Sequence, residues 1–536
     1  MPHLLTRLSI VCAITAACVA ALAVLVTQPA AAAPLAPSAP LAPEATGIYV
    51  TASACPPDSF ENGTKALPFC RIQDAINAAP TNGEIRVAGG LYTYTRVMST
   101  GMDVYTYTQV ALITRSVKLR GSWNADWTVQ SITLTPSTIN PLGKGRGITI
   151  RGVSSPEVSV DDFIITGGDY TGLGNPPGVA TVCPGSELDC GGGLYAHYGK
   201  LLASDLVISG NVAARSTSGR TGFGGGAFLW AVAAGSRIER SSFVNNLSGW
   251  LNSLGGGMYA ESVVGLVITG SGFISNTADD GGAGLFLFHP SGLVAITNTV
   301  FYTNYTWSTN FGGGGLGAKL TLDGVALQAS RLRFSGNYGT NNGAAIMLEK
   351  QGSGVSRVKI DNTLIDNNRD ANDKISSAIY VDYGHSFDVA LDHITAADNR
   401  SDAFLRVHSA YAGSAVTVTL RNTLVHSAQV AYAGEQNAGE APALIRHTNT
   451  LTDGVGALHA DITGTTTFEA INPLGGDPRL DSSYHLQAGS AAIDQGVATG
   501  VTDDIDGDSR TVNAPPDIGA DEYRKFFTYL PLARRT

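Results

Sequence analysis

Apolar and polar positions alternate with a period of two inside a larger repeat that runs from Gly191 to Asn399. Each unit has a glycine run, a short apolar segment, and an asparagine that follows an aromatic or aliphatic residue by three positions. The asparagines are Asn211, Asn246, Asn276, Asn304, Asn337, Asn368 and Asn399, spaced 35, 30, 28, 33, 31 and 31 residues apart. A period of about 31 residues predicts a solenoid, in which each unit buries its apolar face only against its neighbours.

Equivalent positions of successive units carry similar residues. Three positions before the asparagines lie Ile208, Phe243, Phe273, Phe301, Phe334, Ile365 and Ala396, and eight positions before them lie Ala203, Ile238, Ile268, Ile296, Ala329, Ile360 and Leu391. The alternation around these columns is typical of a strand with one face in a core. Units stacked at the strand spacing of about 4.8 Å form a parallel β-helix, an all-β fold. We therefore expect Phe273 and Phe301 to touch inside the core.

The asparagines fit the bends between strands. Asparagine tolerates left-handed backbone and hydrogen-bonds its own chain, and stacked asparagines also bond one another. The sequence therefore predicts a structural ladder of asparagines at one corner of the solenoid.

The two ends of the chain differ from the repeats. Residues 1–33 have the features of a cleaved signal peptide, with Arg7, an apolar stretch and a run of small residues before position 34. Residues 34–45 are a Pro/Ala-rich linker. We expect the N-terminal cap and first turns in 46–190, the regular repeats in 191–428, the last turns and a closing segment in 429–523, and a tail in 524–536. The leader predicts a secreted or cell-surface protein that does not span the membrane after signal cleavage.

A capping helix and two disulfides are predicted near the start. From Arg71 to Ala79 the apolar residues share one helical face, and a solenoid needs a cap over its first turn. Removal of the leader leaves an even number of cysteines in an exported chain. They are Cys55, Cys70, Cys183 and Cys190. Their proximity in sequence predicts the pairs Cys55–Cys70 and Cys183–Cys190.

The repeats and both ends resemble known β-helix proteins. The segment Gly255–Met258 followed by Phe273–Asn276 resembles the paired repeats of polymorphic outer-membrane proteins, whose passenger domains are similar to the right-handed β-helix of pectate lyases. Residues 72–76 and 85–90, with 489–494, 504–510 and 517–523, resemble secreted bacterial β-helix proteins that end in a choice-of-anchor segment. The resemblance implies a right-handed parallel β-helix with a short N-terminal capping helix. It leaves the activity open, because the group contains polysaccharide lyases and hydrolases as well as proteins with no assigned reaction.

Composition and charge limit the partners. Glycine accounts for 64 of 536 residues, charged residues make up 15%, and the net charge is −10. This balance argues against nucleic acid, because neutralising phosphates requires a basic surface. It also argues against strongly anionic glycans, unless a local basic patch or bound cations intervene.

The outward positions of the glycine-run strand form two columns rich in aromatic residues. The first is Tyr195, Phe228, Tyr259, Phe286, Gly317, Met347 and Tyr380, and the second is His197, Trp230, Glu261, Phe288, Lys319, Glu349 and Asp382. Aromatic strips on a surface mark binding sites unless they are covered. Either the long bends at 212–222 and 247–254 bury the rings, or the rings bind the faces of sugars. The candidate ligand-binding residues are Tyr195, Phe228, Trp230, Tyr259, Phe286, Phe288 and Tyr380.

Three carboxylates in these columns are candidate catalytic groups, namely Glu261, Glu349 and Asp382. Glu349 and Asp382 are one unit apart, so their backbones should lie about 4.8 Å apart, close to the ~5–5.5 Å carboxyl separation of a retaining glycosidase. Lys319 precedes them in the same column, which favours a Lys–Glu ladder on the surface instead.

The closing segment carries a candidate cation site. Asp504, Asp506 and Asp508 alternate as in a calcium loop. Ser509 stands where such a loop needs glycine, and Pro515 stands where it needs a bidentate glutamate. A tight turn with Arg510 paired to an aspartate is therefore favoured, with a structural Ca²⁺ as the alternative, and no other cofactor is expected.

Two functions remain. The lack of a convincing acid/base cluster favours an exported, non-catalytic surface protein that presents an elongated face for glycan binding or adhesion. The alternative is a polysaccharide-degrading enzyme, a lyase or a glycoside hydrolase, on the same scaffold. Because fold does not determine activity, both hypotheses require a test against a site, with a polysaccharide or cell-surface glycan as the expected partner.

Overall fold

The computed structural model describes residues 47–52, 61–99, 106–152, 155–173, 188–215, 217–307, 312–340, 342–370, 377–382, 386–409, 416–510 and 515–524. The predicted signal peptide and linker, and nearly all of the predicted tail, lie outside these residues. Within the described residues, no helix is long and apolar enough to cross a membrane.

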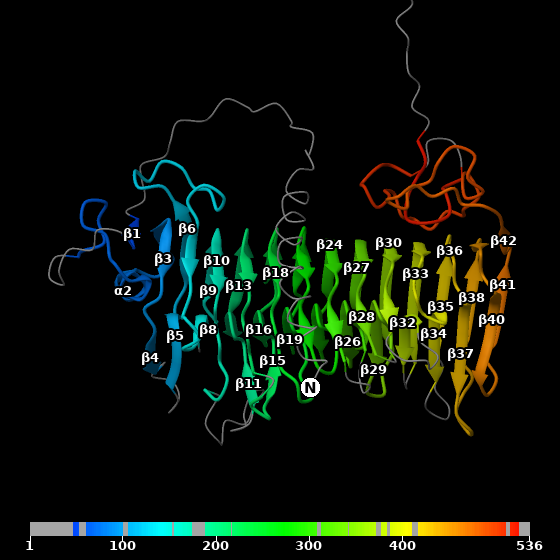
Figure 1. Cartoon of the computed structure of the whole chain (residues 1–536), viewed down its shortest axis with the longest axis horizontal. Helices are drawn as coiled ribbons and strands as arrows, with labels where there is room; N and C mark the ends of the chain where they lie inside the picture. Colours follow the sequence, from blue (N-terminus) through cyan, green and yellow to red (C-terminus); the bar gives the residue numbers. More distant parts are fainter. Residues whose placement is uncertain are drawn as a thin grey trace, which may run out of the picture. The chain divides into compact units, whose positions relative to one another are not determined.

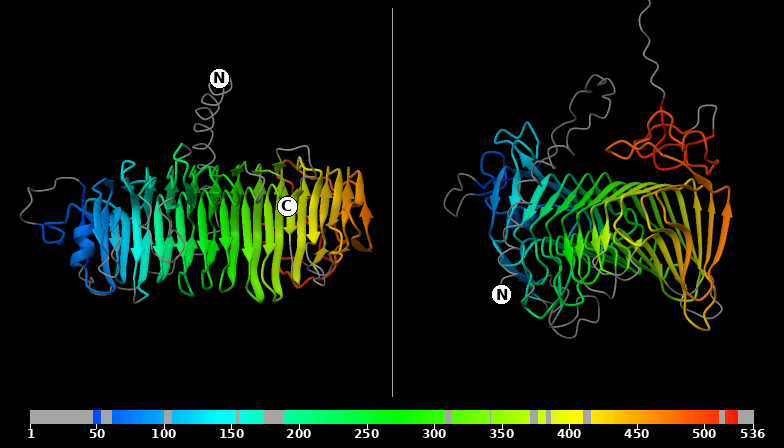
Figure 2. Two further views of the ribbon diagram at one scale, coloured as in Figure 1. Left: turned by 90° about the horizontal axis from the view of Figure 1, so that it is seen from below. Right: turned by 45° about the vertical axis from the view of Figure 1, so that its right-hand side comes forward.

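The unit that starts at Gly47 is an all-β, right-handed parallel β-helix (Figure 1). Its turns stack side by side along one axis, and two large parallel sheets run the length of the stack (Figure 2). One sheet has 13 strands and the other has 23. Two small sheets, of four and of two strands, lie at the bends. The fold predicted from the repeat is confirmed.

The strands are short because glycines and left-handed residues bend the chain at each corner. The 13-stranded sheet consists of β4 (Arg96–Ser99), β5 (Thr106–Ile113), β8 (Arg146–Arg151), β12 (Leu194–His197), β16 (Ala227–Trp230), β19 (Met258–Glu261), β23 (Leu285–Phe288), β26 (Leu316–Leu320), β29 (Ile346–Lys350), β32 (Ser377–Asp382), β34 (Ala403–Ser409), β37 (Val430–Gln436) and β40 (Ala457–Thr463). All of its pairings are parallel except the one between β4 and β5.

The 23-stranded sheet closes the other side of the core. It consists of β1 (Ile48–Val50), β2 (Gly83–Ala88), β3 (Gly90–Tyr92), β6 (Val117–Trp123), β7 (Ser137–Ile139), β9 (Glu157–Asp161), β10 (Phe163–Thr166), β13 (Lys200–Ser204), β14 (Val207–Ser209), β17 (Arg237–Glu239), β18 (Ser242–Val244), β20 (Val267–Thr269), β21 (Gly272–Ile274), β24 (Val294–Tyr302), β27 (Gly324–Ser335), β30 (Ser356–Asp366), β33 (Phe387–Ala397), β35 (Val416–Arg421), β36 (Leu424–His426), β38 (Leu444–Thr448), β39 (Leu451–Asp453), β41 (Thr467–Ile471) and β42 (Leu474–Gly475). The four-stranded sheet is β22 (Thr277–Ala278), β25 (Tyr305–Thr306), β28 (Tyr338–Gly339) and β31 (Arg369–Asp370).

The predicted register holds strand by strand. Met258 pairs with Leu285, and Phe273 pairs with Phe301, at the positions that the repeat aligns. The phenylalanine column is fully buried, and its neighbouring ring centroids lie 4.8, 5.1 and 4.6 Å apart from Phe243 to Phe334. The expected contact between Phe273 and Phe301 is therefore confirmed, and this stack forms one wall of the core.

The asparagines form a continuous ladder, but their backbone role differs from the one expected. Asn246 donates its side-chain N–H to Asn276 Oδ1 at 3.0 Å, and the same bond recurs from Asn211 to Asn399. Each ladder asparagine from Asn246 also donates to a backbone carbonyl of the preceding turn, such as Ile208 O at 2.9 Å. The left-handed conformation falls on the residue just before each asparagine, for example Asn245 and Ser275. The asparagine side chains therefore satisfy the buried hydrogen-bonding groups at this corner, while the residue before each asparagine makes the bend.

The predicted capping helix is present as α2 (Ile72–Ala78). Its apolar residues Ile72, Ala75 and Ile76 are buried on the first turns of the core. Gln73 accepts the backbone N–H of Leu112 at 2.7 Å and donates to the carbonyl of the same residue at 3.2 Å. The helix thus satisfies an open strand edge as well as covering apolar side chains.

The closing segment, residues 476–524, turns back onto the outside of the 23-stranded sheet (Figure 1). It docks on a column of bend residues, because Arg510 donates to Asn362 Oδ1 and Asn422 donates to the carbonyl of Val497. An apolar contact accompanies these bonds, in which Ile518 packs with Leu424. The segment therefore packs onto several turns of the solenoid.

Candidate functional site

The outer face of the 13-stranded sheet divides into two halves. We call the run from β12 to β23 the aromatic half; its rings are Tyr195, Phe228, Trp230, Tyr259, Phe286 and Phe288. We call the run from β26 to β37 the polar half; its residues are Lys319, Glu349, Tyr380, Asp382, Arg406, His408 and Glu435. Both halves occupy the same two outward columns. They differ in the types of side chain they carry and in the chain segments that cover them.

The aromatic half is buried, which corrects the expectation of a sugar-binding platform. Phe228 and Phe286 are 0% exposed, Tyr195 is 2% exposed and Tyr259 is 3% exposed. Trp230 is buried as well, and Phe288 is half-buried. The rings stack on one another with centroids 5.4 to 5.9 Å apart from Tyr195 to Phe286. They form a second apolar core outside the sheet.

A strap of chain covers this second core. It consists of the two-stranded sheet β11 (Leu188–Cys190) and β15 (Thr221–Phe223), followed by Leu254, which bridges to Phe223. Phe223 packs on Tyr259 with centroids 5.0 Å apart, and Leu188, Cys190 and Leu254 join the same cluster. The covered-packing interpretation of the aromatic columns is therefore the correct one.

Glu261 lies within the aromatic half, between Trp230 and Phe288 in the second outward column. It is 8% exposed, and its Oε2 accepts the hydroxyl of Tyr259 at 2.8 Å. Burial raises the pKa of Glu261 to about 7, although the Tyr259 hydrogen bond opposes the shift. This carboxyl therefore holds a proton over part of the neutral pH range and can act as a hydrogen-bond donor.

The polar half contains a ladder of opposite charges on adjacent strands. Lys319 pairs with Glu349 at 3.2 Å, and Asp382 pairs with His408 Nδ1 at 2.8 Å. The other ring nitrogen of His408 lies 3.0 Å from the side-chain nitrogen of Asn437. Burial by itself lowers the pKa of His408, but the hydrogen bond and charge of Asp382 outweigh burial and raise it. Glu435 and Glu440 raise the same pKa further.

Arg406 and Tyr380 form the neighbouring column of this half. The Arg406 guanidinium lies over the Tyr380 ring, 5.0 Å from its centroid, and donates to Glu435 Oε2. Tyr380 is 4% exposed, so it supports Arg406 and is not a surface ligand group. Its expected role in stacking on sugars is thus wrong. Burial, followed by the charge of Asp382, raises the pKa of the Tyr380 hydroxyl.

The polar half suits binding better than acid/base chemistry. Glu349, Asp382 and Glu435 each already contact a basic side chain, so none of these carboxyl groups is left free to act on a substrate. Glycoside hydrolysis needs one carboxyl that holds a proton beside one that does not. Glu261 can hold a proton, but it lies three strands from Glu349, roughly 14 Å along the sheet, beyond the ~9.5 Å that such pairs span.

Arg406, His408 and Glu435 were not predicted as site residues. The sequence repeat was anchored on the asparagines, and the last of these is Asn399. The strands continue past it, because Tyr380 pairs with Arg406 and His408 pairs with Glu435. The alternation of buried Leu405 and Val407 with polar neighbours was the available signal.

A second aromatic group lies on the four-stranded sheet, at positions directly after the ladder asparagines. Tyr305 follows Asn304 and stacks on Tyr338 with centroids 4.3 Å apart. Trp307 contacts Tyr305 and also Trp250, which is 44% exposed. The two tyrosine rings stack face to face and are half-buried, so they cover part of each other's surface.

The closing segment does not gather its three aspartates around one point. Asp504 accepts the backbone N–H groups of Asp506 and Asp508 at 3.0 and 2.7 Å, while Asp508 pairs with Arg524 at 3.1 Å. A bridge between Asp503 and Ser509 confirms the predicted tight turn. Arg510 pairs with Glu522 at 3.1 Å instead of with an aspartate.

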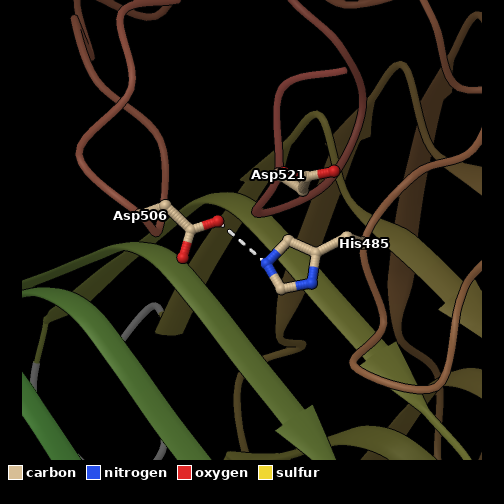
Figure 3. A group of neighbouring side chains, drawn as sticks. All are labelled: His485, Asp506 and Asp521. Atoms are coloured by element: carbon tan, nitrogen blue, oxygen red, sulfur yellow. Dashed lines mark hydrogen bonds and ion pairs between the residues drawn. The ribbon is translucent and has the colours of Figure 1, made fainter. Parts of the chain in front are cut away.

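One group in the closing segment has the residue types of a metal site, namely His485, Asp506 and Asp521 (Figure 3). His485 Nε2 lies 2.8 Å from Asp506 Oδ2, and Asp521 Oδ2 accepts the backbone N–H of Leu486. The hydrogen bond to Asp506 raises the pKa of His485 to about 9. Metal ligation needs a neutral imidazole, so the protonated histidine already supplies the positive charge here. The expectation of a structural Ca²⁺ stays untested.

The disulfides also stay a prediction. Cys55 and Cys183 lie outside the described residues, while Cys70 lies beside α2 and Cys190 lies in the strap. Mass mapping of unreduced peptides would identify the pairs.

The chain matches neither a protein-family model nor a curated protein. Among solved structures it is similar to pectate lyase Pel9A, with a TM-score of 0.41 and 11% identity over 89% of this chain and 96% of the other. It is also similar to the catalytic unit of the GH87 α-1,3-glucanase from Streptomyces thermodiastaticus, with a TM-score of 0.34 and 14% identity over 82% and 70%. An endo-xylogalacturonan hydrolase from Aspergillus tubingensis has a TM-score of 0.23 and 11% identity over 75% and 94%. At these values the likeness carries no argument about activity.

Proposed function

We propose that this protein is an exported, non-catalytic carbohydrate-binding protein, and that the polar half of the 13-stranded sheet is its binding face. The observation that supports the proposal is the ladder from Lys319 to Glu435, which places fixed hydrogen-bonding groups on five adjacent strands. At about 4.8 Å per strand, the ladder is roughly 19 Å long. That length suits an extended chain of sugars better than a small ligand.

The charge of the ladder favours a neutral polysaccharide. Lys319 and Arg406, joined by His408 where it is protonated, stand against Glu349, Asp382, Glu435 and the neighbouring Glu440. Positive and negative groups almost cancel, so no strong field attracts a polyanion. Ion-paired side chains are held in place by their partners, and preorganised groups lose little entropy when they bind sugar hydroxyls.

The alternative is a polysaccharide-degrading enzyme, and the protonated Glu261 is the observation that favours it. A proton donor of this kind needs a carboxylate within reach. The residues that pair with Glu261 on the adjacent strands are Trp230 and Phe288, so no second carboxylate flanks it in its column. Binding without cleavage is therefore the better-supported function.

A retention assay with purified protein tests the proposal. Immobilised neutral polysaccharides (glucan, xylan and mannan) and anionic ones (polygalacturonate and alginate) are compared, and soluble products are measured in the same samples. We expect retention on at least one neutral polysaccharide without product release. Asp382→Asn and Arg406→Gln should each weaken retention by at least about tenfold.

Arg446→Gln is the matched control. It breaks an ion pair with Glu469 of similar type at 2.6 Å, but this pair lies on the other sheet with both side chains 43% exposed. The control should leave retention unchanged. Retention that survives both polar-half variants would reject the site, and sugar release that requires Glu261 would establish the enzymatic alternative.

A further inference from the structure

A cavity lies at the N-terminal end of the solenoid, far in sequence from the polar half. Its volume is about 540 Å³, within the ~300–1,000 Å³ range of small-molecule sites. Strand ends and connections of the first turns form its walls: Gly89 between β2 and β3, Gly90 at the start of β3, Trp123 at the end of β6, and the following loop with Trp127. The proposed function does not use this cavity.

Two indole rings line the cavity, and the chain holds both in place. The Arg86 guanidinium lies over Trp123, 4.7 Å from the centroid of the indole ring. Arg86 is held there by an ion pair in which its Nε lies 2.7 Å from Glu84 Oε1. Trp127 packs edge-on against Tyr49 with centroids 4.8 Å apart. Cationic and aromatic partners therefore hold both rings in place.

The loop that presents Trp127 is strained. Trp127 has a φ of 61°, the left-handed region that costs a bulky residue about 1–2 kcal/mol. Asn124 imposes this conformation, because its Oδ1 accepts the backbone N–H groups of Thr128 and Val129 at 2.8 and 3.1 Å. Left-handed residues recur at the bends of this solenoid, so here the conformation fixes the position of the indole and does not by itself mark the loop as a binding position.

The polar groups of the lining are mostly uncharged. The walls include Thr51, Asn124, Thr135 and Thr138, with Lys65 as the charged side chain among the lining residues and no carboxylate among them. Gly89 and Gly90 also line the cavity, and Gly90 is packed too closely for a side chain, since a Cβ there would lie 2.8 Å from the Ala52 Cβ. Indole rings with threonine hydroxyls and glycine backbone around them match a sugar, whose apolar C–H faces stack on rings while its hydroxyls need partners.

We infer that this cavity is a second binding site, which takes one or two units of a neutral saccharide. It goes beyond the proposed function, because it is a concave site that accepts a chain end or a free sugar, whereas the polar half faces an extended chain. The cavity volume fits a mono- or disaccharide and excludes a long polysaccharide from the interior.

Calorimetric titration of the full mature chain tests the inference, with glucose, galactose, mannose, N-acetylglucosamine and their disaccharides as neutral probes and galacturonic acid as the anionic probe. We expect at least one neutral saccharide to bind with a Kd of about 1 mM or lower. Trp123→Ala removes one indole wall. Ala125→Trp fills the exposed rim of the cavity without deleting a contact and is the variant that keeps the test valid if Trp123→Ala fails to fold.

Each variant should weaken saccharide binding by at least about tenfold. Asp382→Asn is the control, because it alters the polar half and should leave binding of these small saccharides unchanged. No binding of any probe, or binding that survives Ala125→Trp, would overturn the inference. Binding restricted to galacturonic acid and lost in Lys65→Gln would overturn the assignment of a neutral sugar. Since polysaccharide retention by the polar half is measured separately, failure of either site can be told from failure of the other.

Discussion

The aromatic half and the polar half occupy the same columns of one sheet, yet one is a core and the other is a candidate binding face. Phe286 on β23 is fully buried, whereas in the polar half Lys319, Glu349 and Asp382 are 5 to 9% exposed and the side chain of Glu435 on β37 is 18% exposed. The difference comes from cover, because the strap of β11, β15 and Leu254 lies over the aromatic rings. The place of a residue in a column of equivalent positions therefore determines whether its side chain points inward or outward. It does not determine whether an outward side chain is exposed to solvent.

Side-chain packing explains where the aromatic half ends and the polar half begins. Gly317 follows Phe286 in the first column, and a Cβ there would lie 2.7 Å from the Phe286 ring. The last large ring of the stack thus rests over a glycine, and the charged residues begin in the neighbouring column at Lys319. Any larger residue at position 317 would force the ring to move.

The largest expected effect tests the core character of the aromatic half. Phe286→Ala removes a fully buried ring and should lower the free energy of unfolding by about 3–5 kcal/mol. Polysaccharide retention at a temperature where the variant is folded should not change. Denaturant unfolding measures the first effect, with Tyr302→Ala as the control because Tyr302 is 44% exposed. A loss below about 1 kcal/mol would mean that the strap does not cover the rings in solution.

A smaller effect is expected at Glu261, the carboxyl group inside the aromatic half. Its pKa rises from 4.5 to about 7 on folding, so the folded protein keeps a proton that the unfolded chain releases at lower pH. The resulting stabilisation is complete below pH 4.5 and is lost as the pH rises through about 7. Glu261→Gln should remove this dependence and unfold with a free energy roughly 1–2 kcal/mol higher than wild type at alkaline pH. Equal stability curves for the two proteins would contradict the burial of this carboxyl.

In the polar half, pH should act on binding. The pKa of His408 lies above its usual 6.5 because Asp382, Glu435 and Glu440 outweigh burial. The folded state therefore favours the imidazolium form of His408. The stability that this form contributes is complete below pH 6.5 and is lost as the pH rises through the raised pKa of His408. Polysaccharide retention should weaken over the same range, and His408→Gln should flatten the profile. A profile unchanged by this substitution would remove His408 from the binding face.

The smallest effect is expected at the exposed pair of His485 and Asp506, a reference for the buried pairs of the ladder. Their side chains are 35% and 51% exposed, so the pair should contribute no more than about 1 kcal/mol. The stability contributed by this pair is lost as the pH falls through the lowered pKa of Asp506. It is also lost as the pH rises through about 9, the raised pKa of His485. His485→Gln and addition of Ca²⁺ should each shift the Tm only slightly. A clear rise in Tm with Ca²⁺ would instead favour the structural cation.

The fold was predictable because its information is local and repeated. The phenylalanine and asparagine columns recur at a fixed spacing, and residues one turn apart can only stack on one another once the strands form. The left-handed position was misassigned by one residue. Both an asparagine and its predecessor are compatible with the bend, and only the inward hydrogen bonds of Asn246 and its equivalents distinguish them.

The site was harder to predict because exposure depends on chain segments that lie outside the repeat. The sequence by itself determined the strand register, the inward and outward directions, the capping helix and the chemistry of each outward column. The tertiary structure decided that the strap buries the rings around Tyr259, and that strands beyond Asn399 carry His408 and Glu435 into line with Asp382. The physical reason is that periodicity specifies how a turn stacks on the next, whereas cover and side-chain pairing depend on which non-repeating segments pack against that face.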